Sequence, residues 1–205
     1  PGFGGSCFKK DILNLVYLSR YFGLNEVADF WESVVSLNSW HQHRISKLVV
    51  KKLFGTVSGK KICILGFAFK ANTNDTRESA SIIICKDLIE EGANLKIHDP
   101  KVSSSQIEKD LSKKEKSKIQ TQNKYLNNAE GEWTKEVSII KAAEDTDAIL
   151  VLTEWKEYAK IDWSVISKKM RKPAWVFDAR SIVSKEKVLS SDLNLWRIGD
   201  GFSRD

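Results

Sequence analysis

The chain has 205 residues, 41% of them hydrophobic and 29% charged, and a net charge of +6. This balance provides enough apolar material for a core and excludes an intrinsically disordered protein. Apolar runs such as 82–85 and 148–152 are too short to span a bilayer, and residues 1–7 do not have the composition of a signal peptide. The three cysteines do not predict a disulfide framework. We therefore expect a protein that works without a membrane, in the reducing environment of the cytoplasm.

Two helices are expected before residue 55. Apolar residues recur at helical spacing from Ile12 to Phe22, and Gly23 is placed to end that helix. A longer helical pattern without proline runs from about Asn25 to Phe54. A helix of about 28 residues would be about 40 Å long, which is more than the core of a small domain requires. We expect it to bridge two domains or to pack against a second copy of the chain.

From residue 59 onward the pattern alternates between strands and helices. The predicted strands are 62–66, 94–98, 137–140, 148–152, 174–177 and 194–198, and the predicted helices are 79–91, 141–145 and 163–170. Such alternation is typical of a parallel sheet with right-handed crossovers. The predicted fold class is α/β: an N-terminal helical segment with a long central helix, followed by a Rossmann-like, doubly wound parallel sheet. The expected domains are residues 1–54 and 55–205.

A polar, lysine-rich insert interrupts this alternation. Seven lysines stand against three acidic residues between Lys101 and Lys124. A nucleic-acid site usually combines basic residues with aromatic or recognition elements on an ordered face, and large apolar residues are few here. We interpret the insert, which extends to Lys135, as a solvated loop, and we expect no nucleic-acid partner.

Ligands of doubly wound sheets bind beyond the carboxyl ends of the strands. The first of these ends has Gly66, but Ala68 stands where a dinucleotide fingerprint needs its second glycine, so it is a poor NAD site on its own. Three cations fall at the same edge: Lys70, Arg77 and Arg180. Either they hold a phosphorylated ligand or they are ordinary surface cations, and the residues alone leave both interpretations open.

A second candidate site lies in the glycine-rich segment at residues 1–7. Cys7 follows two glycines and a serine and precedes a helix, where backbone N–H groups and the helix dipole favour a thiolate. Asp11 lies one helical turn further on, on the same face. No histidine is near Cys7 in sequence, so a protease-type pair is not predicted, and a structural role for Cys7 stays open. Cys63 and Cys85 are expected in the core, and no cysteine, histidine or carboxylate spacing predicts a metal site.

Three segments together resemble a known enzyme family. Residues 2–11, Gly-Phe-Gly-Gly-Ser-Cys-Phe-Lys-Lys-Asp, followed by Asn14 and Leu15, resemble the active-site cysteine segment of UDP-glucose 6-dehydrogenases. Residues 66–70, Gly-Phe-Ala-Phe-Lys, with residues 75–79, Asp-Thr-Arg-Glu-Ser, resemble the second signature of that family. Residues 177–180, Phe-Asp-Ala-Arg, resemble the third. The motifs occur in the order of the family and span nearly the whole chain.

The resemblance implies a role for each matching residue. Members of the family have an NAD-binding Rossmann domain, a long central helix used in dimerisation, and a Rossmann-like domain that binds UDP; this chain resembles the C-terminal portion. By this likeness Cys7 is the catalytic nucleophile and Asp11 assists water or proton handling beside it. The substrate-binding residues would be Phe3, Gly4, Phe8, Phe69, Lys70 and Arg180, the last reaching the substrate of a neighbouring subunit. Lys10 and Arg77 would contact the cofactor, NAD.

The implied reaction oxidises UDP-glucose to UDP-glucuronate with two NAD⁺, through a thiohemiacetal and a thioester on Cys7. The resemblance also implies a homo-oligomer built from dimers, and inactivity of this chain without the NAD-binding domain. Two alternatives remain. One is a dehydrogenase of another nucleotide sugar, such as a UDP-N-acetylhexosamine or GDP-mannose. The other is a non-catalytic nucleotide-binding and oligomerisation module in which Cys7 is structural.

Overall fold

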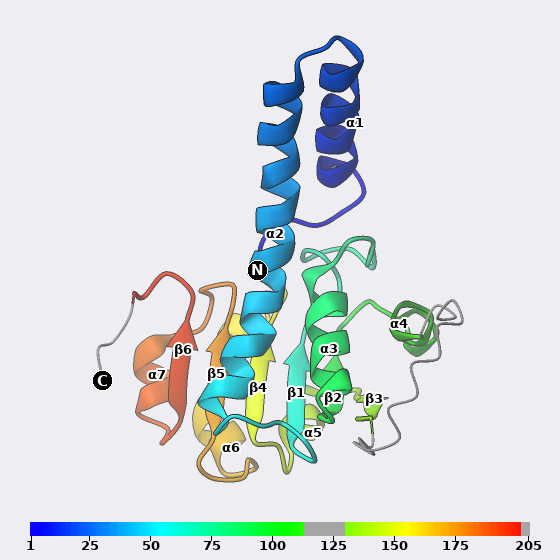
Figure 1. The fold of residues 1–205 in the computed structure, drawn as a ribbon. Coiled ribbons are helices and arrows are strands. Elements are labelled where there is room, and N and C mark those ends of the chain that lie inside the picture. The colour runs from blue at the N-terminus through cyan, green and yellow to red at the C-terminus, as the bar shows by residue number, and fades with distance from the viewer. Residues whose placement is uncertain (113–129, 202–205) are drawn as a thin grey trace, which may run out of the picture.

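The computed structural model describes residues 1–112 and 130–201. A helical hairpin, formed by α1 (Phe8–Tyr21) and α2 (Asn25–Lys52), projects from one edge of a sheet domain (Figure 1). Both helices were predicted, and the C-terminal part of α2 packs on the sheet through Ile45 and Val49, which are 1% and 0% exposed. The long helix therefore joins the hairpin to the sheet domain.

The sheet is parallel throughout the described residues. Its strands are β1 (Lys61–Leu65), β2 (Asn94–His98), β3 (Trp133–Lys135), β4 (Ala148–Val151), β5 (Trp175–Asp178) and β6 (Asn194–Arg197). They are ordered β3-β2-β1-β4-β5-β6, and every neighbouring pair is parallel. Leu65 is in register with His98 on one side and with Val151 on the other, so the carboxyl ends of the three central strands lie at one edge. The predicted doubly wound α/β fold is confirmed.

Helices cover both faces of the sheet. One face carries α2, α3 (Ala80–Glu90) and α4 (Ser104–Leu111); the other carries α5 (Ile139–Ala143), α6 (Trp163–Ser167), α7 (Lys185–Leu189) and the short 3₁₀-helix η1 (Tyr158–Lys160). Side chains alternate along a strand, so Ile62 and Ile64 of β1 face the first layer, whereas Cys63 and Leu65 face the second. Burying each such aliphatic side chain stabilises the fold by roughly 1.5–3 kcal/mol.

Part of the insert predicted as a solvated loop is ordered. The insert contains α4 and β3, whereas its residues 113–129 lie outside the described residues. The Ser103 hydroxyl accepts a hydrogen bond from the Gln106 amide at 3.2 Å and caps α4. Ile107 and Leu111, one turn apart, reach the core. Two apolar residues in a polar stretch were too few to predict this helix.

The strand predicted at 137–140 is wrong. The strand is β3, a few residues earlier, and Val137 is 86% exposed in the connection that follows it. The Ser138 hydroxyl accepts from the Lys141 amide at 3.3 Å, so this capping serine begins α5 at Ile139. The helix α7 was not predicted either, because its five residues contribute one buried side chain, Val188.

The projecting hairpin has a small core of its own. Ile12 and Val16 of α1 pack against Ala28 of α2. Its outer surfaces expose large apolar side chains, including Phe30 and Leu37, each 62% exposed. Among the described residues, no helix combines the length and the hydropathy that a membrane-spanning helix needs.

Candidate active site

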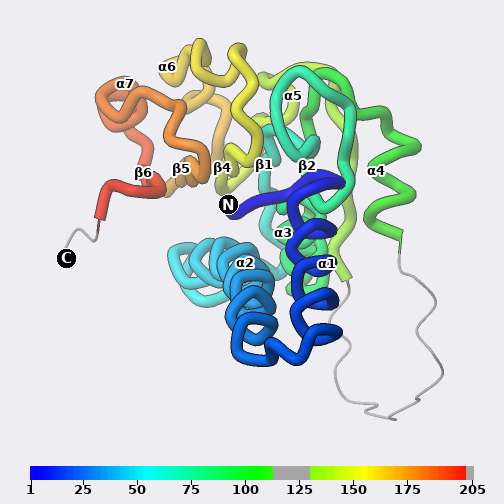
Figure 2. Tube along the Cα trace, turned by 90° about the horizontal axis from the view of Figure 1, so that it is seen from above, coloured from blue at the N-terminus to red at the C-terminus, as the bar shows by residue number. Residues whose placement is uncertain are grey.

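The segment 1–7 runs over the carboxyl edge of the sheet, beside α2 (Figure 2). The Phe3 amide donates to Asn38 Oδ1 at 2.8 Å. The side-chain amides of Asn38 and Gln42 donate back to the Phe3 carbonyl at 3.1 and 3.3 Å. Two residues further on, the Gly5 amide donates to the Arg77 carbonyl at 3.0 Å. The segment is thus fixed on one side to α2 and on the other to the loop between β1 and α3.

Gly4 lies where this segment passes closest to that loop. A Cβ atom at this position would lie 2.3 Å from the carbonyl oxygen of Glu78, so only glycine fits without a shift of backbone. Glu78 has a positive φ of 55°, and its carboxylate pairs with Lys9 Nζ at 2.8 Å. The close approach gives a physical reason for a glycine in the first motif.

Cys7 stands at the N-terminus of α1 and is exposed. Its Sγ lies 3.6 Å from Ser6 Oγ. The rings of Phe3 and Phe8, which flank Ser6 and Cys7 in sequence, pack edge to face with their centres 4.7 Å apart. Cys63 and Cys85 are completely buried, and burial raises the pKa of both thiols well above the usual value. Cys7 is therefore the thiol that is open to chemistry.

The two polar residues expected beside Cys7 face solvent. The Asp11 amide donates to the Cys7 carbonyl at 2.9 Å, which confirms that Asp11 lies one helical turn beyond the cysteine. The Asp11 carboxylate pairs with Lys10 Nζ at 3.4 Å, and these side chains are 67% and 72% exposed. Within the described residues, no group of three or more histidine, cysteine or acidic side chains is arranged to hold a metal ion.

Phe69 connects the predicted site residues. Its amide donates to the Asp75 carbonyl at 3.1 Å, and its carbonyl accepts from Arg180 Nη2 at 3.1 Å. A Cβ on Gly5 would meet the Phe69 ring at 2.8 Å, so the first segment lies against this ring. Lys70 Nζ lies 5.3 Å from the ring centre, within range of a cation–π interaction. The residues of all three motifs therefore meet around Phe69.

Arg180 is held between the ends of β1 and β4. Its Nε donates to the Leu152 carbonyl at 2.7 Å and lies 3.3 Å from Glu154 Oε2. The side chain is only 21% exposed, and burial lowers the pKa of its guanidinium below the usual value. A half-buried cation with two backbone partners is a fixed part of the edge and not a loose surface charge.

Arg77 is different, because its side chain is 69% exposed. Its Nη2 pairs with Asp75 Oδ2 at 2.7 Å. The hydrogen bond with Arg77 lowers the pKa of Asp75, and the same bond raises the pKa of Arg77. The backbone of Arg77 belongs to the site through Gly5, while its side chain faces outward.

Asp99, the residue after β2, is a buried part of the site to which the sequence motifs assign no role. This carboxylate is 3% exposed, and its Oδ2 accepts from the Phe67 amide at 2.8 Å and from the Ala68 amide at 3.0 Å. Nearby, the Thr153 hydroxyl donates to the Ala68 carbonyl at 2.6 Å. The only sequence signal for Asp99 and Thr153 was that each directly follows a predicted strand.

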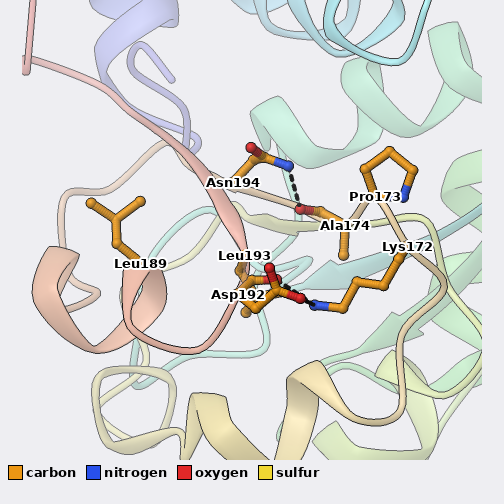
Figure 3. Close-up of a pocket in the computed structure, with 7 residues that line it drawn as sticks. All are labelled: Lys172, Pro173, Ala174, Leu189, Asp192, Leu193 and Asn194. Atoms are coloured by element: carbon orange, nitrogen blue, oxygen red, sulfur yellow. Dashed lines mark hydrogen bonds and ion pairs between the residues drawn. The ribbon is translucent and has the colours of Figure 1, made fainter.

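A pocket of about 520 Å³ lies at the opposite edge of the sheet, at the amino ends of β5 and β6 (Figure 3). Its polar groups already bind one another: Lys172 Nζ pairs with Asp192 Oδ2 at 3.1 Å, and Asn194 Nδ2 donates to the Ala174 carbonyl at 3.2 Å. Ligands of this architecture bind at the carboxyl edge. The pocket therefore lies apart from the candidate site.

Comparison with protein families gives a match over most of the sheet domain. Residues 63–185 match the UDP binding domain of the UDP-glucose/GDP-mannose dehydrogenase family. UDP-glucose 6-dehydrogenase 1 of Glycine max is 43% identical over 203 residues, which cover 97% of this chain and 42% of that protein. The UDP-glucose 6-dehydrogenase of Drosophila melanogaster is 41% identical over 203 residues, covering 99% of this chain and 41% of that protein. The chain thus spans about two fifths of the length of these relatives.

Solved structures show the same fold. A UDP-glucose dehydrogenase from Pyrobaculum islandicum superposes with a TM-score of 0.69 at 23% identity, over 96% of this chain and 37% of that one. An NDP-N-acetyl-D-galactosaminuronic acid dehydrogenase from Methanosarcina mazei gives a TM-score of 0.71 at 19% identity, over 97% and 38%. The hairpin and the sheet domain are both included in these alignments.

Proposed function

Because this chain belongs to the UDP-glucose/GDP-mannose dehydrogenase family, we propose that it binds the UDP moiety of a nucleotide sugar at the carboxyl edge of its sheet and supplies Cys7 as the nucleophile. The observation that carries this proposal is the hydrogen bond from the Gly5 amide to the Arg77 carbonyl, which places the cysteine segment against the second motif. Relatives of 41–43% identity named UDP-glucose 6-dehydrogenases favour UDP-glucose as the substrate.

The proposed binding residues surround Phe69. Lys70 is exposed and free to approach a diphosphate, and Arg180 is held beside it by the Phe69 carbonyl. Phe3, Gly4 and Phe8 would line the sugar side of the site. We propose that Arg180 also reaches substrate held by a neighbouring subunit.

The turn after β1 does not fit the pyrophosphate of NAD. A dinucleotide site needs small residues whose backbone a pyrophosphate can approach, but Phe67 and Ala68 are both 0% exposed. We therefore propose that NAD is held by the part of the enzyme that the relatives have beyond this match. In that arrangement Arg77 and Lys10, both exposed, would contact the cofactor. It follows that this chain alone does not oxidise UDP-glucose.

The proposed chemistry of this chain concerns the aldehyde stage. Two NAD⁺ molecules, bound one after the other, would each accept one of the two hydrides that the oxidation of an alcohol to a carboxylate releases. The Cys7 thiolate adds to the aldehyde carbon and forms a thiohemiacetal, whose tetrahedral carbon keeps its C–H bond beside an alkoxide oxygen and can therefore release a hydride. Loss of the second hydride leaves a thioester on Cys7, and water displaces the sulfur to give the carboxylate and the free thiol. Asp11, one turn from Cys7 and open to solvent, would accept the proton of that water.

Titration of the chain with UDP tests the binding proposal directly. We expect binding in calorimetry, and we expect Lys70→Ala to weaken it by about tenfold, the scale of one lost charge-assisted contact. Lys60→Ala is the matched control, because Lys60 precedes β1 at the opposite edge of the sheet. No binding of UDP to the wild-type chain, or equal affinity in both variants, would overturn the proposal. GDP serves as the competitor that separates the two nucleotide classes of the family.

A further inference from the structure

The Asp99 carboxylate is buried under five N–H donors. Its Oδ2 accepts from the Phe67 and Ala68 amides at 2.8 and 3.0 Å and from Trp155 Nε1 at 3.3 Å. Its Oδ1 accepts from the Lys101 and Val102 amides at 2.9 and 3.0 Å. A buried carboxylate is costly unless hydrogen bonds replace its water, and here donors approach both oxygens.

These donors come from three loops at the carboxyl edge of the sheet. Phe67 and Ala68 follow β1, Lys101 and Val102 follow β2, and Trp155 lies after β4. In a dinucleotide-binding domain the turn after β1 approaches the pyrophosphate, which sits at the N-terminus of the following helix. In this chain the corresponding N–H groups are directed at a carboxylate from the neighbouring strand.

We infer that Asp99 is a resident anion that takes the place of a ligand phosphate at the turn after β1 and positions Phe69 and Lys70 for the diphosphate of UDP. Its two effects are separate. It bars dinucleotide phosphate from this turn, and it fixes the peptide that leads into the proposed UDP-binding residues. The second effect rests on the proposed function; the first does not. Asp99 is thus a positioning residue and does not itself contact the substrate.

Asp99 is linked to Phe69 through the backbone of one residue, Ala68. The Ala68 amide is held by Asp99 Oδ2, and the Ala68 carbonyl accepts from Thr153 Oγ1 at 2.6 Å. The next amide, that of Phe69, donates to the Asp75 carbonyl. Each polar backbone group from Phe67 N to Phe69 O therefore has a partner, because Ser79 Oγ also donates to the Phe67 carbonyl at 2.8 Å. Removal of the carboxylate frees the two amides at the start of this series.

Asparagine cannot replace Asp99 in this setting. An asparagine has one oxygen and one NH₂ group, and the NH₂ group only donates. In one orientation of the side chain the NH₂ group would face the N–H donors of Phe67, Ala68 and Trp155. In the other orientation it would face the amides of Lys101 and Val102. Either way, two or three N–H donors lose their acceptor, although the shape of the side chain is unchanged.

The test compares Asp99→Asn with Asp147→Asn. Asp147 also accepts a backbone amide, that of Lys61 at 2.8 Å, and pairs with Arg171 at 2.6 Å, but it lies at the amino edge of the sheet. We expect Asp99→Asn to weaken UDP binding about tenfold or more, since charge-assisted hydrogen bonds that fix the site are lost. Asp147→Asn should lower the melting temperature and keep the affinity for UDP within about twofold, because distant sites act independently. Wild-type affinity in folded Asp99→Asn, or equal weakening in both variants, overturns the inference.

Two further measurements keep the test decisive if Asp99→Asn does not fold or if UDP does not bind. In the wild-type chain, amide hydrogen exchange at Phe67 and Ala68 should be far slower than at the exposed Asn72; equal rates would contradict a resident anion. In Asp99→Gly, added acetate should slow exchange at Phe67 and Ala68, whereas chloride should not. Absence of UDP binding by the wild-type chain, with these amides protected, would count against the proposed function and leave the anion assignment standing.

Discussion

The guanidinium of Arg180 donates to the carbonyl of Phe69 at 3.1 Å, across 111 residues of sequence. This contact joins the loop after β5 to the loop after β1, and it is made by two residues from different sequence motifs. A lysine could supply the charge but not the two directed N–H bonds that Arg180 makes to Leu152 and Phe69.

Arg180→Lys is therefore expected to weaken UDP binding by about tenfold, because Phe69 loses its partner while a positive charge remains. Calorimetric titration with UDP measures the effect. The control is Arg20→Lys, in which the altered cation pairs with Glu32 on the distant hairpin. Retention of wild-type affinity in Arg180→Lys would show that the charge alone matters.

Thiol alkylation separates Cys7 from the other two cysteines. In the folded chain we expect one thiol to react with iodoacetamide, because Cys7 is exposed while Cys63 and Cys85 are completely buried. Burial also raises the pKa of both core thiols, which suppresses their reactive thiolate form. All three should react in denaturant. Mass spectrometry counts the alkylated thiols. Rapid alkylation of all three under native conditions would disprove this assignment.

Substitution of Gly66 is expected to destabilise the fold. Gly66 has a φ of 97°, and a Cβ there would lie 2.3 Å from Cβ of Thr153. Gly66→Ala should lower the free energy of unfolding by about 2–4 kcal/mol, since backbone strain and a clash add together. Gly59→Ala is the control: the φ of Gly59 is 71°, but an added Cβ would meet nothing within 4 Å, so only the strain of about 1 kcal/mol applies. Equal losses of unfolding free energy in the two variants, measured by urea denaturation, would show that the close approach to Thr153 is unimportant.

The stability of the chain should fall in mild acid through His98. Burial lowers the pKa of this imidazole below its ordinary value of 6.5, so the unfolded chain binds the proton at a higher pH than the folded chain does. The contribution of neutral His98 is complete above pH 6.5 and is lost as the pH falls through the lower, folded-state pKa. His98→Gln should flatten the pH dependence of the unfolding free energy in that window. An identical slope in the variant would refute the prediction.

The exposed face of the hairpin predicts self-association. Phe30, Leu37 and Trp40 of α2 are 56–62% exposed, which is unusual for a monomer when such residues share one helix. Sedimentation is expected to show a dimer of this chain, and Leu37→Glu should shift it to the monomer. Glu26→Lys on the same helix is the control for a simple change of charge. A monomeric wild-type chain at micromolar concentration would contradict a dimer formed through this face.

Much of the fold follows from the sequence because its central strands carry strong local signals. The strands β1 and β4 are continuous apolar runs, and both appear where they were predicted. The edge strand β3 has no fully buried residue, so its three residues leave no comparable pattern. The short helices α4 and α7 each depend on one or two buried side chains, which tertiary packing selects and local spacing does not reveal.

The candidate site divides in the same way. The motifs around Cys7, Phe69 and Arg180 were recognisable because each is a contiguous run of residues. The role of Asp99 was not, because its partners Phe67 and Trp155 lie more than thirty residues away on either side. Convergence of three loops on one carboxylate is a property of strand order, and it becomes visible only once β1 lies between β2 and β4.

The anchoring of the first segment also limits where the length of this chain can vary. Phe3 is hydrogen-bonded to Asn38 of α2, and Gly5 is hydrogen-bonded to Arg77. The three residues from Phe3 to Gly5 therefore connect α2 with the loop between β1 and α3. One residue spans at most about 3.6 Å of extended chain. An inserted or deleted residue here would therefore move the Cys7 sulfur by up to about that distance. At the tip of the hairpin, by contrast, a Cβ added to Gly23 would meet nothing within 4 Å. Insertions belong at that tip, and the spacing from Phe3 to Cys7 must stay constant.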